Sequence, residues 1–408
     1  MRTEKIAVLI AIIAISLIGI RPKNVPAWVW AGAGVIALLG LGLESLRLAF
    51  DAVLTQWNVL LFILGLMGIS AAAEYSGLFE WIASALLERA SGSRRLLFVN
   101  LFIAGSVMTI FFSNDATAIV FTPIIFRTVA KRGIDALPYL YACTFVADTA
   151  SFGLPFSNPT NLLVLPRPNF IPFLLHLGPP MLISLVINLA VFLLMFRTRL
   201  RGHYVVEPTR AIERRQRYTL AAMVAVAAAY VVALALRWPL GPVAVIGALF
   251  VLVAGKVYPR EASQRIGWST FPLLAGLFVL LDAVSRSGFT TWAISGLHRM
   301  AHEGPLATIL AAAFGSALAA NLFNNLPIAV ISGTVVSHGS ESWLAYPLIA
   351  GVDLGPNLTT TGSLATILWL SILRSRGLTI NPLEYLRLGL TVVPAMLMVT
   401  SLWLWLTG

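Results

Sequence analysis

Long apolar runs separated by short polar clusters dominate the chain. Runs near or above the ~17–25 residues that cross a bilayer as a helix predict membrane-spanning helices. The plain spans are expected at 5–20, 26–43, 56–75, 175–196, 218–236, 240–256, 266–284 and 383–407.

Four further apolar stretches have polar centres, at 98–126, 139–165, 306–335 and 343–372. Lipid-exposed backbone there would be unpaired, so these stretches must be buried in protein or line a cavity. The stretches with polar residues at 114–115 and 324–325 fit re-entrant helical hairpins. The other two contain proline, which breaks a helix, and they predict spans with an unwound centre. The pattern therefore predicts an all-α polytopic membrane protein with about ten transmembrane helices, two re-entrant hairpins and helices broken at the midplane.

The chain also contains an internal repeat. A shift of about 210 residues places WNVLLFILGL at 57–66 on WSTFPLLAGL at 268–277, and Asn114 on Asn324. At a slightly smaller offset Asp148 falls on Asp353. Each half has an odd number of crossings, so the halves should be inverted relative to one another, as in many secondary transporters. We expect a first inverted repeat at 1–196, a basic linker at 197–217 and a second inverted repeat at 218–408.

Composition excludes a soluble globule. The 408 residues are 58% apolar and only 11% charged, whereas a soluble domain carries ~25% charged residues. The net charge of +11 comes from Arg clusters at the ends of apolar runs, where they meet anionic lipid headgroups rather than nucleic acid. The positive-inside rule places 197–217 in the cytoplasm and both termini outside, in a multi-pass protein of the plasma (inner) membrane.

Metal, cofactor and nucleotide chemistry find little support in the sequence. A single cysteine, Cys143, excludes an intramolecular disulfide or a Cys-ligated metal, and the five histidines lie outside the polar centres in no metal-binding spacing. No phosphate-binding Gly-Lys-Ser/Thr loop is present. We expect a secondary transporter without a cofactor, not an enzyme.

Three aspartates in the polar centres are candidate proton-coupling groups: Asp115, Asp148 and Asp353. An aspartate at the bilayer centre costs about 2.5–3.5 kcal/mol of insertion free energy. A helix-capping role could account for one such aspartate more easily than for all three. A buried carboxyl group can also take up and release a proton during transport.

The four polar-centred stretches contain no Lys or Arg. Their neutral donors and acceptors favour a polyhydroxylic neutral solute or a cation over an anion. About half of these polar residues should only repair broken backbone. The substrate-binding candidates are Ser113, Asn114, Asp115, Asn158, Thr160, Asn161, Asn324, Asn325, Asn357, Thr361 and Ser363.

With these residues in view, the chain resembles the arsenite and antimonite efflux permeases (ArsB family) of the ion transporter superfamily. The resemblance runs nearly end to end. It rests on SGLFEW at 76–81, ND at 114–115 followed by TPI at 122–124, ADTAS at 147–151, NNLP at 324–327, and DLGP at 353–356 continuing to GSLAT at 362–366. It implies a substrate held between two hairpin tips and two unwound spans, and export of trihydroxyarsenic or its antimony analogue in exchange for protons by alternating access. The lone cysteine forbids three-thiolate capture of As(III), so the metalloid would be recognised through its hydroxyl groups.

Two alternatives stay open at this point. SNPTN at 157–161 is closer to elements of the superfamily's sodium-coupled carboxylate carriers, so a sodium/proton antiporter or a sodium-coupled carboxylate carrier of the same fold competes. The other is a membrane subunit of an ATP-driven arsenical pump, with a soluble ATPase as partner. A homodimer is also left open.

Overall fold

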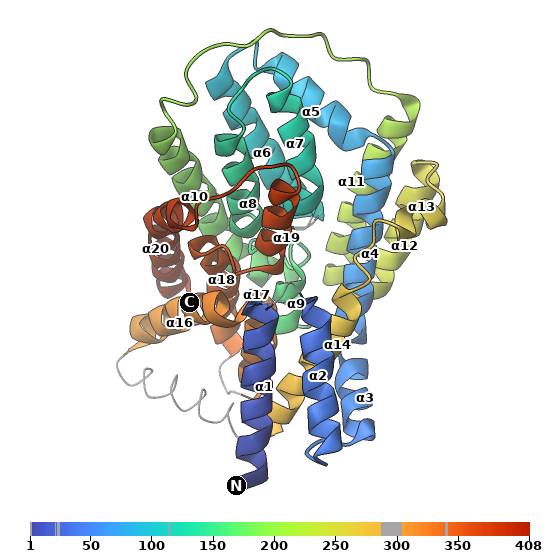
Figure 1. The fold of residues 1–408 in the computed structure, drawn as a ribbon, viewed down its shortest axis with the longest axis vertical. Coiled ribbons are helices and arrows are strands. Elements are labelled where there is room, and N and C mark those ends of the chain that lie inside the picture. Colours follow the sequence, from blue (N-terminus) through green and yellow to red (C-terminus); the bar gives the residue numbers. More distant parts are fainter. Residues whose placement is uncertain are drawn as a thin grey trace.

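The computed structural model is a bundle of helices that describes residues 2–20, 22, 25–112, 114, 116–286, 304–338 and 342–408 (Figure 1). Apart from one isolated bridge between Ser93 and His203, the regular structure of these residues is helical, which confirms the all-α expectation. The elements are α1 (Arg2–Ile20), α2 (Ala27–Gly40), α3 (Leu46–Thr55), α4 (Trp57–Tyr75), α5 (Leu78–Arg89), α6 (Arg94–Phe112), a π-helix (Ala116–Phe121), α7 (Thr122–Ala130), α8 (Leu137–Thr149), α9 (Pro159–Val164), α10 (Phe170–Met195), α11 (Arg214–Ala235), α12 (Leu240–Ala254), α13 (Pro259–Ser263), α14 (Thr270–Arg286), α16 (Pro305–Phe323), α17 (Asn325–His338), a 3₁₀ turn (Ser342–Leu344), α18 (Ala345–Leu354), a second 3₁₀ turn (Gly355–Leu358), α19 (Leu364–Arg374) and α20 (Pro382–Thr407).

Apolar helices of membrane-spanning length confirm the multi-span architecture. Six helices in the described ranges are long and apolar enough to cross a bilayer, namely α4, α6, α10, α11, α16 and α20. Shorter apolar helices accompany them, α1, α2 and α12 among these. Each plain span expected from the apolar pattern coincides with a helix, although α10 and α11 begin several residues earlier than the pattern indicated.

The four polar-centred stretches are interrupted helices. In the first, Thr117 of the π-helix folds back on α6, donating a hydrogen bond to Gly105 O (3.4 Å) and accepting one from Thr109 (2.8 Å). In the third, α16 and α17 meet at Asn324, whose φ of +73° lies in the left-handed region, and the two helices contact each other. These are the two hairpins.

The second and fourth stretches are broken spans. Residues 150–158 separate α8 from α9, and residues 355–363 separate α18 from α19. Asn158 caps α9 by accepting a hydrogen bond from the Thr160 N–H (3.2 Å), and Ser363 caps α19 by accepting one from the Thr366 N–H (3.0 Å). Both second halves therefore start at a side-chain cap that satisfies an otherwise unpaired N–H group.

Besides the five-residue α13, two short helices, α3 and α5, were not expected. Both are too short and too polar to span a bilayer, and the search for long apolar runs passes over such amphipathic segments. Ser45 caps α3 by accepting a hydrogen bond from the Leu48 N–H (3.2 Å). Gly77 begins α5 with a φ of +73°, a conformation that glycine adopts without steric cost.

Two close helix crossings join the first part of the chain to the second. A Cβ at Gly65 of α4 would lie 2.3 Å from the backbone carbon of Ala244 in α12. A Cβ at Gly276 of α14 would lie 2.7 Å from the Ala31 Cβ in α2. Gly65 and Gly276 are the glycines that the sequence repeat aligned, and the absence of side chains lets each pair of helices approach closely.

The 197–217 segment crosses one end of the molecule, at the top of Figure 1. Tyr204 donates a hydrogen bond to Leu87 O (2.6 Å), Thr209 donates to Ser84 O (2.9 Å), and Glu207 pairs with Arg132 (2.7 Å). The segment is thereby held against α5 and the end of α7.

Candidate functional site

All four polar-centred stretches meet at one small central cavity. Its volume is about 30 Å³, comparable with the space of a water molecule. The described residues that line it come from both hairpin tips, both broken spans and the two aligned helices α4 and α14: Ile63, Asn114, Asn158, Pro159, Thr270, Leu274, Asn325, Leu326 and Ala365. The expected convergence of the polar centres is therefore present in the structure.

A buried carboxylate lies beside this cavity. Asp353, near the end of α18, is 1% exposed. Thr160 donates a hydrogen bond of 2.6 Å to Oδ1 and Asn158 one of 3.1 Å to the same atom, while Ser151 donates to Oδ2 at 3.0 Å. Both oxygens thus have neutral donors, supplied by the opposite broken span.

The ion pairs among the described residues leave Asp353 without a Lys or Arg partner. Its charge is accordingly held by hydroxyl and amide dipoles alone, which can also accommodate the neutral acid by rotating a hydroxyl group. Asn158 has several roles, because it caps α9, lines the cavity and contacts both Asp353 and Ser151.

Asp148 lies near this cluster on α8. It is also 1% exposed, and its backbone carbonyl accepts a hydrogen bond of 2.9 Å from Ser151 Oγ. The Ser151 hydroxyl therefore links the backbone of one aspartate to the carboxylate of the other. Asp115 and Ser113, the remaining candidates at the first hairpin tip, lie outside the described residues.

Several substrate-binding candidates serve the backbone instead. Asn161 donates to the carbonyls of Ser151 and Leu154, both at 2.9 Å, and thereby holds the unwound segment. Asn357 donates to Phe145 O and to Thr149 Oγ1, both at 3.1 Å, and joins the two broken spans.

The second hairpin tip has the same kind of backbone contacts. The Asn324 amide donates to Thr361 O (3.5 Å), and the Asn325 N–H donates to Gly362 O (2.9 Å). Ser363 acts as the cap of α19. Asn324 and Asn325 thus hold the tip against the fourth polar stretch, in which Thr361 is exposed.

Ser151, Thr149 and Asn188 take part in the polar cluster, although the sequence analysis did not select them. Asn188 of α10 donates to Thr149 Oγ1 at 3.1 Å, and Ser151 contacts Asp353. Asn188 could have been found as an isolated amide within an otherwise apolar span, and Ser151 as a hydroxyl three residues after Asp148.

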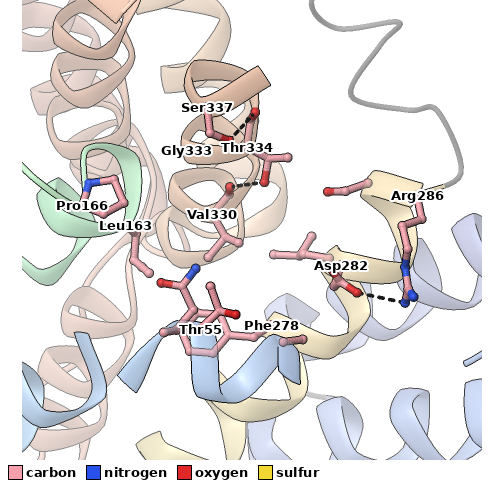
Figure 2. A pocket seen from close by; sticks show the side chains of 14 residues that line it. Thr55, Leu163, Pro166, Phe278, Asp282, Arg286, Val330, Gly333, Thr334 and Ser337 are labelled. Carbon is pink, nitrogen blue, oxygen red and sulfur yellow. Dashed lines mark hydrogen bonds and ion pairs between the residues drawn. The ribbon is translucent and has the colours of Figure 1, made fainter. Parts of the chain in front are cut away.

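A larger vestibule approaches the central cavity from one side. It has a volume of about 590 Å³ and is lined by α3, α9, α14 and α17, of which the last three also contribute to the central cavity. Figure 2 shows Val330, Thr334 and Ser337 of α17 facing it, with the Asp282–Arg286 ion pair (2.9 Å) beside it. The helix α3 and the end of α14, which line the vestibule, lie away from the 197–217 segment in Figure 1, so the vestibule lies toward the opposite end of the molecule.

Comparisons with known proteins agree with this architecture. An arsenical pump membrane protein of Escherichia coli is 25% identical, with 96% of each chain covered. One from Escherichia coli strain K12 is 27% identical, covering 84% of this chain and 85% of the relative. They confirm the resemblance found in the sequence motifs. The crystal structure of the Alcanivorax borkumensis YdaH transporter, described as having an unusual topology, has a TM-score of 0.57 at 14% identity, covers 87% of this chain and 86% of that one, and supports the fold.

The family profile described as citrate transporter (CitMHS) matches residues 7–351. This match covers most of the chain, including both hairpins and the first broken span. The protein is therefore a membrane transporter rather than an enzyme, and it belongs to the CitMHS family.

Proposed function

We propose that this transporter exports the neutral hydroxides of trivalent arsenic and antimony in exchange for protons. The observation that carries the proposal is the central cavity, where three amide side chains, those of Asn114, Asn158 and Asn325, converge next to the Asp353 carboxylate. Amides both donate and accept hydrogen bonds, and a carboxylate accepts them, as hydroxyl groups on a small solute require. The names of the arsenical pump relatives support the same substrate class.

A carboxylate substrate such as citrate fits this cavity poorly. An anion would meet the negative charge of Asp353, which is held by the neutral groups of Ser151, Asn158 and Thr160 with no basic partner in the described structure. Two like charges in a medium of low dielectric repel strongly. A neutral hydroxide avoids this cost.

The size of the cavity supports alternating access. A trihydroxy metalloid is larger than the space of about 30 Å³, so the hairpin tips at Asn114 and Asn325 must separate to admit it. The vestibule supports access from the side opposite the 197–217 segment, whose arginines favour a cytoplasmic location for that segment. Inverted repeats would let the corresponding route open on the cytoplasmic side in the other state.

Proton coupling follows if substrate and proton compete for one carboxyl group. Asp353 in its ionised form accepts hydrogen bonds from metalloid hydroxyls, whereas a protonated Asp353 offers a different set of donors and acceptors. Protonation from outside would release the metalloid, and loss of the proton inside would permit rebinding.

The test is transport by the purified chain in proteoliposomes, with antimonite as substrate and a pH gradient as the only driving force. We expect antimonite movement against the proton gradient with choline in place of sodium and with no ATP. A strict need for sodium would favour the sodium-coupled alternative, and transport only with an added ATPase and ATP would favour the pump subunit. Citrate in place of antimonite should give no flux.

A further inference from the structure

A column of buried polar side chains leads from Asp148 toward the face covered by the 197–217 segment. On α8, Tyr141, Thr144 and Asp148 lie on one side, because their spacings of three and four residues match the helical period. The helices α19 and α20 add Thr366 and Tyr385 to the same side. Ring contacts join the three helices, because Tyr141 of α8, Trp369 of α19 and Tyr385 of α20 all pack on one another with centroids 6.1–6.2 Å apart.

The column begins at the central site. Ser363 and Thr366 share a hydrogen bond of 2.8 Å between their hydroxyl oxygens. Thr366 lies 3.5 Å from the Thr144 hydroxyl, and Ala365, between Ser363 and Thr366, lines the central cavity. Hydroxyl groups thus continue from the cavity wall into the helix interface.

Tyr385 is the next member. Its side chain is fully buried, its hydroxyl lies within electrostatic range of the Thr144 and Thr366 hydroxyls, and the charge of Asp148 acts on it. Its ring centroid is 6.2 Å from that of Tyr141. Tyr141 lies about one helical turn before Thr144 and is therefore closer to the start of α8. The polar column therefore runs from the carboxyl group of Asp148, a candidate proton-coupling residue, past Tyr385 to a second buried tyrosine, Tyr141.

The far end of the column reaches solvent. Glu384 acts electrostatically on the Tyr141 hydroxyl and lies 3.9 Å from Arg199, which in turn is 3.8 Å from Asp135. The three charged side chains are 36–42% exposed. Arg199 belongs to the 197–217 segment, so the column ends at the face that this segment covers.

The two tyrosine hydroxyls do not serve the packing of the helices. Glu384 lies near the Tyr141 hydroxyl, and Thr144 and Thr366 lie near that of Tyr385, but neither hydroxyl has a partner at full hydrogen-bond geometry among the described residues. Their rings pack in an otherwise aromatic cluster, in which Phe145 lies 5.0 Å from both Phe192 and Tyr385. Phenylalanine would fill the same space without burying an unpaired hydroxyl, which costs free energy. Buried hydroxyls of this kind are usually bridged by water.

We propose that this column conducts protons between Asp148 and the face beneath the 197–217 segment, separately from the route of the metalloid. This inference rests on the proposed proton exchange at Asp353, from which the proton reaches Asp148 beside Ser151, whose hydroxyl contacts both residues. Each hydroxyl of Tyr385 and Tyr141 accepts a proton on its oxygen and passes on the proton it held, with water across the gaps, so each side chain ends as it began. A proton that leaves Asp148 arrives at Glu384 and then in solvent.

The experiment removes the hydroxyls and keeps the rings. Tyr385→Phe and Tyr141→Phe are reconstituted in proteoliposomes with a trapped pH dye. Tyr230→Phe is the matched control, because the Tyr230 hydroxyl is also buried without a partner, but its ring packs on Phe62 and Phe156, away from the column. Two rates are measured: proton movement driven by an antimonite gradient, and antimonite exchange at equal pH, which moves no net protons.

We expect the two column variants to lose about tenfold in proton movement, less than the ~100-fold or more of a positioned proton-transfer group because water can partly replace a hydroxyl. Antimonite exchange should stay at the wild-type rate, and the Tyr230→Phe control should match wild type in both assays. Wild-type proton movement in both column variants overturns the inference, as does an equal loss of exchange and proton movement. An absence of proton movement in the wild type, with exchange intact, instead refutes the proposed proton coupling.

Discussion

Thr160 and Asp353 are 193 positions apart, yet the Thr160 hydroxyl donates a hydrogen bond of 2.6 Å to the Asp353 carboxylate. The bond joins α9 to α18, one from each broken span. Removal of either partner would leave a buried polar atom unsatisfied. The two broken spans therefore share one polar centre, and a change at that centre is felt by both.

Asp353→Asn should abolish proton-driven antimonite efflux, by at least about 100-fold, because the amide has similar size but cannot take up a proton. The protein should still insert and purify. Asp51→Asn, at an exposed position of α3, is the control and should transport at the wild-type rate. Full proton-driven efflux by the Asp353 variant would exclude this residue as the coupling group.

Antimonite affinity should weaken as the pH is lowered, if proton and metalloid compete for Asp353. The ionised carboxylate accepts hydrogen bonds that the protonated acid cannot accept in the same way. Binding to the purified protein, measured by calorimetry across the pH range, should show this dependence in the wild type and lose it in Asp353→Asn. Affinity that does not change with pH in a proton-exchanging wild type would point to separate sites.

Cys143→Ala should give arsenite resistance equal to that of the parent. The thiol is buried in α8 and makes up the whole thiol content of the chain, so it supplies at most one of the bonds in a three-thiolate site. Resistance of cells that express the variant is the readout. Loss of arsenite binding in a normally folded variant would contradict recognition through hydroxyl groups.

Gly65→Ala should lower the thermal stability of the protein in detergent. Its new Cβ would lie 2.3 Å from the Ala244 backbone, and such overpacking costs about 1–3 kcal/mol. Gly32→Ala on α2 is the matched control, since a Cβ there meets nothing within 4 Å and the helix gains up to ~1 kcal/mol. Equal melting temperatures for the two variants would show that the α4–α12 crossing tolerates a wider separation.

Tyr204→Phe should lower stability at neutral pH by about 1 kcal/mol through the lost hydrogen bond to Leu87 O. Burial raises the pKa of Tyr204 above its ordinary value, against an opposing effect of Arg132. Because the folded pKa is the higher one, the neutral hydroxyl stabilises the fold up to the ordinary pKa of ~10, and this contribution is lost as the pH rises through the raised value. Melting temperatures of wild type and variant should therefore converge at strongly alkaline pH, and a constant difference would contradict this account.

The two ends of the bundle should be labelled from opposite sides of the membrane. In a Cys143→Ala background, Ala130→Cys at the end of α7 should react with an impermeant thiol reagent only in inside-out vesicles. Ala307→Cys near the start of α16 should react only in intact cells. The reverse pattern would invert the assignment made from the arginines of 197–217.

Sequence patterns predicted the helical architecture well, because long apolar runs and internal prolines follow directly from the bilayer as a solvent. The family resemblance, rather than these patterns, led to the expectation that hairpin tips and broken spans meet, and Asn114, Asn158 and Asn325 line one cavity. Local pattern could not show which neutral residues hold Asp353, because Ser151 and Thr160 reach it only through the tertiary arrangement.

Sequence patterns likewise could not show that the asparagines have different structural roles. Asn158 and Asn161 lie in the same short motif, but the first contacts the carboxylate and the second holds the backbone of residues 151 and 154. Asn158 is the N-cap of α9 and has an extended backbone, whereas Asn161 lies inside the helix, so the two amides point in different directions. Composition and spacing treat such residues alike.

The Gly65–Ala244 and Gly276–Ala31 crossings also bear on how the chain is made. Helices α2 and α4 each find their close partner in α14 and α12, more than 170 residues later. A nascent chain that ends at residue 217 has inserted its first helices but still lacks these partners. The early helices must therefore remain in the lipid without their close partners until α12 and then α14 have been synthesised. Final assembly is thus expected after synthesis of most of the chain, and premature termination within the 197–217 segment should yield a fragment that is inserted but quickly degraded.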